Sequence, residues 1–74
     1  MTKLKALLID DDLKFCQTFH ALAETTFDLT VVHSGKEGLA ALNKTTPHVV
    51  LLDLKLGKGM NGIEVLKRIK KNTA

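Results

Sequence analysis

Four aspartates occupy positions from which they could do chemistry. Asp10, Asp11 and Asp12 directly follow an apolar run, and Asp53 ends a run of four aliphatic residues. An unpaired carboxylate at the end of so apolar a segment is expensive to bury. Clustered carboxylates repel one another, and a hard divalent cation such as Mg²⁺ relieves the repulsion. A carboxylate beside such a cation can also attack phosphorus and form an aspartyl phosphate. These residue types indicate a metal or phosphate site, provided that the fold brings them together.

The segments around these aspartates alternate between strand and helix patterns. Strands are predicted at residues 4–9, 29–33 and 49–52. Helices are predicted at residues 13–24, after a capping box at 34–37, and after Asn61, with a loop at 43–47. This βαβαβα order implies a parallel sheet with helices on both faces and right-handed crossovers. If the strand order is 2-1-3, the carboxyl ends of the first and third strands bring Asp10, Asp11 and Asp53 together.

Apolar spacing predicts which helix faces are buried. The first helix has a stripe of Phe15, Phe19 and Leu22, flanked by the small residues Cys16 and Ala23. The second is expected to turn Leu39 and Leu42 inward, and the third to bury Ile63, Leu66 and Ile69. Asp12 is expected to cap the first helix.

Composition narrows the class of protein. A chain of 74 residues, 45% hydrophobic and 26% charged, allows one small globular domain. Its apolar runs fall far short of the roughly 20 residues that a membrane span needs. Cys16 is the only cysteine, which excludes an internal disulfide and favours a cytoplasmic setting. The net charge of +3 is unevenly spread, with six basic residues and one acidic residue from Lys55 to the end. No aromatic residues are interleaved there, so this segment indicates a solvated helix face and argues against nucleic-acid binding. His20, His33 and His48 show no metal-ligand spacing.

Two segments resemble the motifs of response-regulator receiver domains. The run LLIDDD at residues 7–12 is similar to their first-strand motif, and VVLLDL at 49–54 followed by MNGIE at 60–64 is similar to their phosphoacceptor segment. The resemblance covers essentially the whole chain. It implies a flavodoxin-like, doubly wound parallel α/β fold, truncated to three strands in the order 2-1-3 and three helices. Residues 1–74 would form a single, incomplete domain containing the first three βα units.

The resemblance also implies a function and a set of site residues. Asp53 would accept a phosphoryl group from a sensor histidine kinase, in a signalling domain that is not an enzyme. Mg²⁺ would be held by Asp10, Asp11, Asp53 and the backbone carbonyl of Lys55.

The sequence departs from the family pattern in two ways. Gly57 stands where receivers usually have proline, and Gly62 follows Asp53 by nine residues, where the family has eight. The family's phosphoryl-contacting hydroxyl and lysine residues match no position here. We therefore expect weakened Mg²⁺ binding and little stable phosphorylation. The alternative function is an assembly module that self-associates through the open edge of the strand at 49–52.

Two other functions fit parts of the sequence less well. Asp10 and Asp12 match the Asp-x-Asp motif of haloacid-dehalogenase-type phosphatases, but a helix follows at once and Asp53 would have no role. Residues 57–62 form a literal G-x-G-x-x-G. As a dinucleotide-binding motif it is weak, because residues 54–56 separate Asp53 from the first glycine and the acidic ribose partner, about 20 residues further on, would fall beyond Ala74. Glycines of a flexible loop explain the pattern better.

Overall fold

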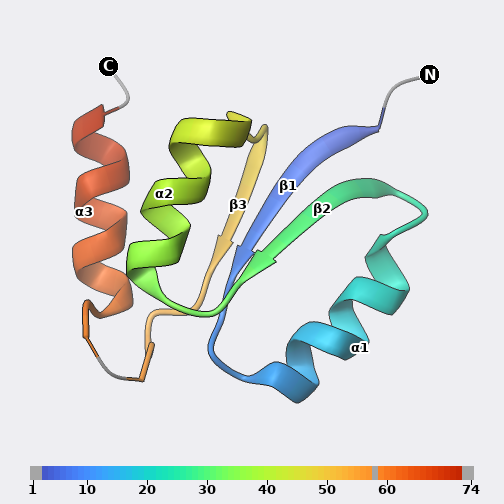
Figure 1. The fold of residues 1–74 in the computed structure, drawn as a ribbon, viewed down its shortest axis with the longest axis horizontal. Coiled ribbons are helices and arrows are strands. Elements are labelled where there is room, and N and C mark those ends of the chain that lie inside the picture. Colours follow the sequence, from blue (N-terminus) through green and yellow to red (C-terminus); the bar gives the residue numbers. More distant parts are fainter. Residues whose placement is uncertain (1–2, 58, 73–74) are drawn as a thin grey trace.

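The computed structural model describes residues 3–57 and 59–72 and shows the predicted alternation of strands and helices (Figure 1). The strands are β1 (Leu4–Ile9), β2 (Phe27–Val32) and β3 (Val49–Leu52). The helices are α1 (Leu13–Ala23), α2 (Gly35–Thr45) and α3 (Gly62–Asn72). Within these described ranges, no helix is both long enough and apolar enough to cross a membrane.

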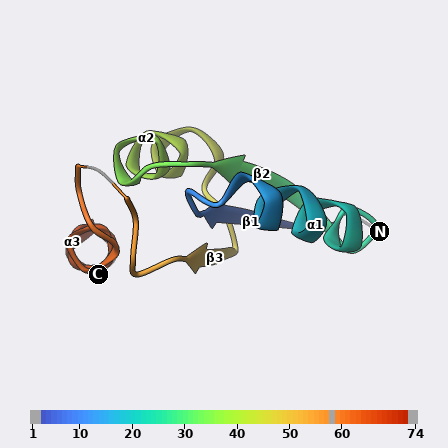
Figure 2. The same cartoon turned by 90° about the horizontal axis from the view of Figure 1, so that it is seen from below.

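The three strands form one parallel sheet in the order β2-β1-β3, which confirms the predicted topology. Leu8 of β1 pairs with Val31 of β2 on one side and with Leu51 of β3 on the other. Figure 2 shows α1 on one side of this sheet and α2 and α3 on the other. Because β1 is central, the carboxyl ends of β1 and β3 are direct neighbours.

The tightest packing lies between the sheet and the α2–α3 side. Leu7, Ile9 and Val65 are fully buried there, and Leu39 and Leu42 of α2 pack against them, as predicted. A Cβ atom on Gly38 would lie 2.4 Å from Cδ1 of Ile9. Glycine at that position therefore lets α2 approach β1 closely.

The face of α1 that contacts the sheet differs from the predicted one. Cys16 and Ala23 are buried, with 4% and 7% of their surface exposed, whereas Phe15 and Leu22 are 48% and 76% exposed. Phe15 instead stacks on the half-buried Phe19, with ring centroids 6.0 Å apart. The small side chains of Cys16 and Ala23 let α1 lie close to the sheet. The predicted stripe of larger residues is rotated away from the sheet, toward the edge of the contact.

The buried face of α3 also differs from the prediction. Val65 is fully buried and Ile69 half-buried, while Ile63 and Leu66 are exposed. The reason is that α3 packs along α2, with Val65 against Gly35, and an edge contact between two helices buries a narrower stripe than packing on a sheet.

The boundaries of β2 and α2 differ from the expected ones, and α1 ends at Ala23, one residue before its predicted end. β2 covers Phe27–Val32, so it begins two residues before the predicted start and leaves His33 outside. α2 continues to Thr45 through part of the predicted loop. It ends at Thr46, which adopts a left-handed conformation with φ of 46° and donates its N–H to the carbonyl of Leu42.

Candidate metal centre

Backbone pairing places two aspartates side by side at the carboxyl edge of the sheet. The Asp10 N–H donates to the Val32 carbonyl at 3.1 Å, and the Asp53 N–H donates to the Ile9 carbonyl at 2.9 Å. The hydrogen-bond pattern of the sheet thus continues one residue beyond β1 and β3. Both aspartates are fixed by main-chain bonds where those strands end.

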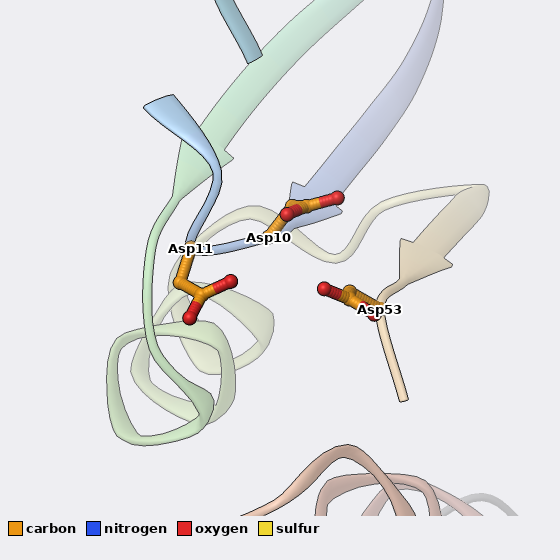
Figure 3. Close-up of side chains that lie close together, drawn as sticks. All are labelled: Asp10, Asp11 and Asp53. Atoms are coloured by element: carbon orange, nitrogen blue, oxygen red, sulfur yellow. The ribbon is translucent and has the colours of Figure 1, made fainter. Parts of the chain in front are cut away.

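Three carboxylates converge at this edge (Figure 3). Asp10, Asp11 and Asp53 each offer an oxygen atom, and these three atoms all lie within 4.8 Å of one another. Asp10 and Asp53 are half-buried and Asp11 is exposed. The structure therefore brings together the three acidic side chains that the topology predicted to meet.

Local amides orient two of these carboxylates. The Asp12 N–H donates to Asp10 Oδ1, and the Lys55 N–H donates to Asp53 Oδ1, each at 2.9 Å. Both bonds span two residues, the pattern of an aspartate that closes its own turn. The second bond also places the Lys55 main chain beside Asp53, where its carbonyl was predicted to act as a ligand.

Gly57, in the loop after β3, and Gly62, the first residue of α3, let other groups approach the site. A Cβ atom on Gly57 would lie 2.6 Å from Asp11 Oδ2, and one on Gly62 would lie 2.4 Å from the Asp53 carbonyl oxygen. Close packing against the acidic site therefore accounts for two glycines of the G-x-G-x-x-G pattern. Lys58, in the middle of that pattern, lies outside the described residues.

Asp12 lies beside the three carboxylates but has a different role. Its Oδ1 accepts the N–H of Phe15 at 3.0 Å, so it is the N-cap of α1, as predicted. Ser34 and Asn61 cap α2 and α3 in the same way, through the amides of Glu37 and Glu64. In the predicted capping box the Glu37 carboxylate accepts from the Ser34 hydroxyl.

Two residues that the sequence did not single out for the site contact Asp10. His33 Nδ1 lies 3.1 Å from the Asp10 carbonyl oxygen, and Cys16 Sγ donates to the same oxygen at 3.3 Å. Burial raises the pKa of the Cys16 thiol, and the carboxylates of Asp10, Asp12 and Asp11 raise it further. One signal in the sequence was available: His33 directly follows β2, whose carboxyl end adjoins that of β1.

The donor set suits a hard divalent cation. Carboxylate oxygens from three residues, two of them partly accessible to solvent, are ligands that Mg²⁺ prefers, and Mg²⁺ keeps several water molecules that a phosphate can replace. A cation at this point would offset the mutual repulsion of the carboxylates. It would also leave one oxygen of a carboxylate such as that of Asp53 available for attack on an electrophile.

Comparison with known proteins agrees with the fold. Residues 6–74 match the family model of the response regulator receiver domain. The Transcriptional regulatory protein CpxR homolog of Haemophilus influenzae is 41% identical over 68 residues, which are 90% of this chain and 29% of that protein. The Nitrate/nitrite response regulator protein homolog of the same organism is 38% identical over 71 residues, which are 92% of this chain and 34% of that protein.

A solved structure shows the same likeness in three dimensions. The N-terminal domain of a response regulator receiver protein from Methanoculleus marisnigri JR1 superposes with a TM-score of 0.88 at 35% identity. The match covers 95% of this chain and 57% of that domain. The chain thus spans about a third of the curated relatives and rather more than half of the solved domain. With its parallel α/β topology and its matching family model, the chain belongs to the response regulator receiver domain family.

Proposed function

We propose that Asp53 is a phosphoacceptor that takes a phosphoryl group from a sensor histidine kinase, with Mg²⁺ held by Asp10, Asp11, Asp53 and the Lys55 carbonyl. One observation carries the proposal: three carboxylate oxygens lie within 4.8 Å of one another at the carboxyl ends of neighbouring parallel strands. We further propose that this occurs in the cytoplasm, within a longer response regulator that controls transcription, as the names of the relatives suggest.

The chain's own residues set up the transfer. A carboxylate oxygen of Asp53 attacks phosphorus, the new O–P bond forms, and the N–P bond to the donor histidine breaks and leaves its electron pair on nitrogen. The Lys55 amide holds Oδ1 of Asp53, which restricts rotation of the carboxylate and aims it. Asp10, held by the Asp12 amide, turns an oxygen toward the same point. When bound, Mg²⁺ supplies charge neutralisation for the carboxylates and the transferring group.

Phosphate uptake tests the acceptor. The chain is treated with a small acyl phosphate and Mg²⁺, and its intact mass is measured. We expect a small, Mg²⁺-dependent phosphorylated fraction, because the hydroxyl and lysine that contact the phosphoryl group in the family match no residue here. Asp53→Asn should abolish it, and Asp28→Asn, an exposed aspartate on β2, should not. An equal mass gain in Asp53→Asn would refute the acceptor, and efficient, lasting phosphorylation would refute the expected impairment.

Metal titration tests the cation site separately. We expect the amide resonances of Asp10, Asp11 and Asp53 to shift with millimolar Mg²⁺, and Asp10→Asn to weaken binding by about tenfold or more. Asp28→Asn is again the matched control. Unchanged resonances at these three positions in the wild-type chain would contradict the site.

A second candidate function is self-association through the open edge of β3. In the order β2-β1-β3, the outer edge of β3 has main-chain groups with no partner strand within the described sheet. Leu51 of β3 is exposed, and so is Leu54, two residues beyond the strand. An unpaired, apolar edge is a template for another strand, and we propose a second copy of this chain as the partner.

Oligomeric state tests this second candidate. We expect light scattering to show dimers or larger species at micromolar concentration, and Leu51→Lys to shift the chain toward monomer by placing a charge on the edge. Leu13→Lys, at an exposed leucine at the start of α1, should leave the assembly intact. A folded wild-type monomer would contradict self-association.

A further inference from the structure

Two side chains from different elements meet on one main-chain oxygen of the site. His33, which follows β2, places Nδ1 at 3.1 Å from the Asp10 carbonyl oxygen, and Cys16 of α1 places Sγ at 3.3 Å from it. This carbonyl belongs to the peptide bond that joins Asp10 to Asp11. The Asp10 N–H is held in turn by the Val32 carbonyl at 3.1 Å. The main chain of Asp10 is therefore held from both sides.

The chemistry of the contact determines where the protons lie. A carbonyl oxygen has two lone pairs and can only accept, so both neighbours must donate. Donation by His33 requires the tautomer that carries its proton on Nδ1, and donation by Cys16 requires its S–H to point at the same oxygen. The 3.9 Å between Sγ and Nδ1 is then the separation of two donors that share an acceptor.

We propose that Cys16 and His33 are positioning residues that fix the Asp10–Asp11 peptide so that both carboxylates face Asp53. The inference rests on the proposed Mg²⁺ site, since its consequence is metal affinity. The Asp10 carboxylate already accepts a hydrogen bond from the Asp12 amide. The rotation that remains to be restricted is that of the Asp10–Asp11 peptide plane. Loss of one donor lets this peptide rotate and spreads the carboxylates.

The proton assignment can be tested without metal. At a pH well above the ordinary imidazole pKa of about 6.5, ¹⁵N spectra of the imidazole side chains distinguish the two neutral tautomers. We expect the Nδ1–H form for His33. The Nε2–H form would overturn the proposal, whether or not the chain binds Mg²⁺.

Mg²⁺ affinity tests the positioning role with matched variants. We expect Cys16→Ala and His33→Phe each to weaken Mg²⁺ binding by up to about tenfold. This is the lower end of the loss expected when a residue that orients a metal ligand is removed. Cys16→Ser should restore affinity close to wild type. Serine and alanine are close in size, so the difference between them reports the donated hydrogen bond and not packing.

A neighbouring residue supplies the control. Gln17 lines the same hollow, about 360 Å³ in volume, as Cys16 and His33. Gln17→Ala should leave the affinity unchanged. Equal binding by the alanine and serine variants of Cys16 would overturn the positioning role. A wild-type chain that binds no Mg²⁺ would overturn the proposed metal site, and the tautomer of His33 would still decide whether the donor contact exists.

Discussion

At the scale of single residues, neighbouring aspartates of one short run have different roles. Asp10 and Asp11 turn oxygens toward Asp53, whereas Asp12 accepts the Phe15 amide and caps α1. Residue type alone does not distinguish these roles, because each carboxylate can accept a hydrogen bond or bind a cation. The start of a helix decides the matter, since its first amides need an acceptor.

Asp12 therefore contributes to stability more than to the site. Asp12→Ala should lower the free energy of unfolding by about 1 kcal/mol, because the cap is lost, and Asp12→Asn should keep most of it. Urea unfolding measures both. Mg²⁺ affinity should change little, since the Asp12 group that contacts Asp10 is its backbone amide. If Asp12→Asn abolished phosphate chemistry while Asp53→Asn retained it, the phosphatase function would be favoured instead.

Cys16 makes stability depend on pH above neutrality. Its pKa is raised in the folded chain by burial and by Asp10, Asp12 and Asp11, whereas an unfolded thiol titrates near about 8.5. Below that pH the thiol is protonated in both the folded and the unfolded chain, so Cys16 causes no loss of folding stability. As the pH rises above it, the unfolded state loses its proton first, so the free energy of unfolding falls.

Comparison with a variant that has no thiol isolates this effect. The free energy of unfolding of the wild type should fall relative to that of Cys16→Ser as the pH rises from neutrality through the ordinary thiol pKa. Urea unfolding at a series of pH values measures the difference. Parallel profiles for the two proteins would contradict the raised pKa.

At the scale of elements, periodicity predicted where helices lie better than how each is rotated. The expected stripe of α1 was Phe15, Phe19 and Leu22, but the sheet is contacted by Cys16 and Ala23. Both stripes have helical spacing and lie side by side on the same helix. The small residues lie at the contact because they allow the helix axis to approach the strands. The spacing of apolar positions alone does not reveal this preference.

The start of α3 is coupled to the acceptor through Gly62. A Cβ atom there would lie 2.4 Å from both the Asp53 carbonyl oxygen and Leu54 Cα, so Gly62→Ala must push the helix away from this main chain. We expect a loss of stability of about 1–3 kcal/mol, as for other overpacked sites, together with weaker Mg²⁺ binding. Thermal unfolding and metal titration measure the two effects.

Gly59 provides the matched control for Gly62. It lies in the loop just before α3, with φ of +85° and open space around the position of a Cβ atom. Asparagine tolerates left-handed backbone better than most residues, so Gly59→Asn should retain Mg²⁺ binding. If both variants behaved alike, general loop flexibility would explain the glycines better than close approach.

At the scale of the whole molecule, the sheet is unequally covered. The fully buried large side chains, Leu7, Ile9 and Val65, lie on the α2–α3 side, whereas Phe15 and Leu22, large residues of the α1 side, are exposed. Exposed apolar residues also occur on α3, at Ile63 and Leu66. The site lies at the carboxyl edge, where loops from both sides meet. A cation there would link β1 and β3 through side chains as well as through backbone hydrogen bonds.

Metal binding should therefore stabilise the whole fold. A ligand that binds only the folded state adds about 1.4 kcal/mol at ten times its dissociation constant. We expect Mg²⁺ to raise the midpoint of thermal unfolding, and K⁺ at matched ionic strength to have no such effect. In Asp53→Asn, Mg²⁺ should no longer raise the midpoint of thermal unfolding. If Mg²⁺ raised it equally in that variant, charge screening would explain the effect.

The sequence by itself determined the order of elements and the parallel sheet, because the strand and helix patterns alternate along the chain and right-handed crossovers leave few topologies. The meeting of Asp10, Asp11 and Asp53 required the strand order 2-1-3 as well, which the family resemblance implied, since only adjacent strands have neighbouring carboxyl ends. Only the tertiary structure decided the rotation of α1 and α3, the contacts of Cys16 and His33 with Asp10, and the close approach at Gly62. The physical reason is that these features depend on how closely and at what rotation helices pack, which side-chain volumes from distant segments set jointly.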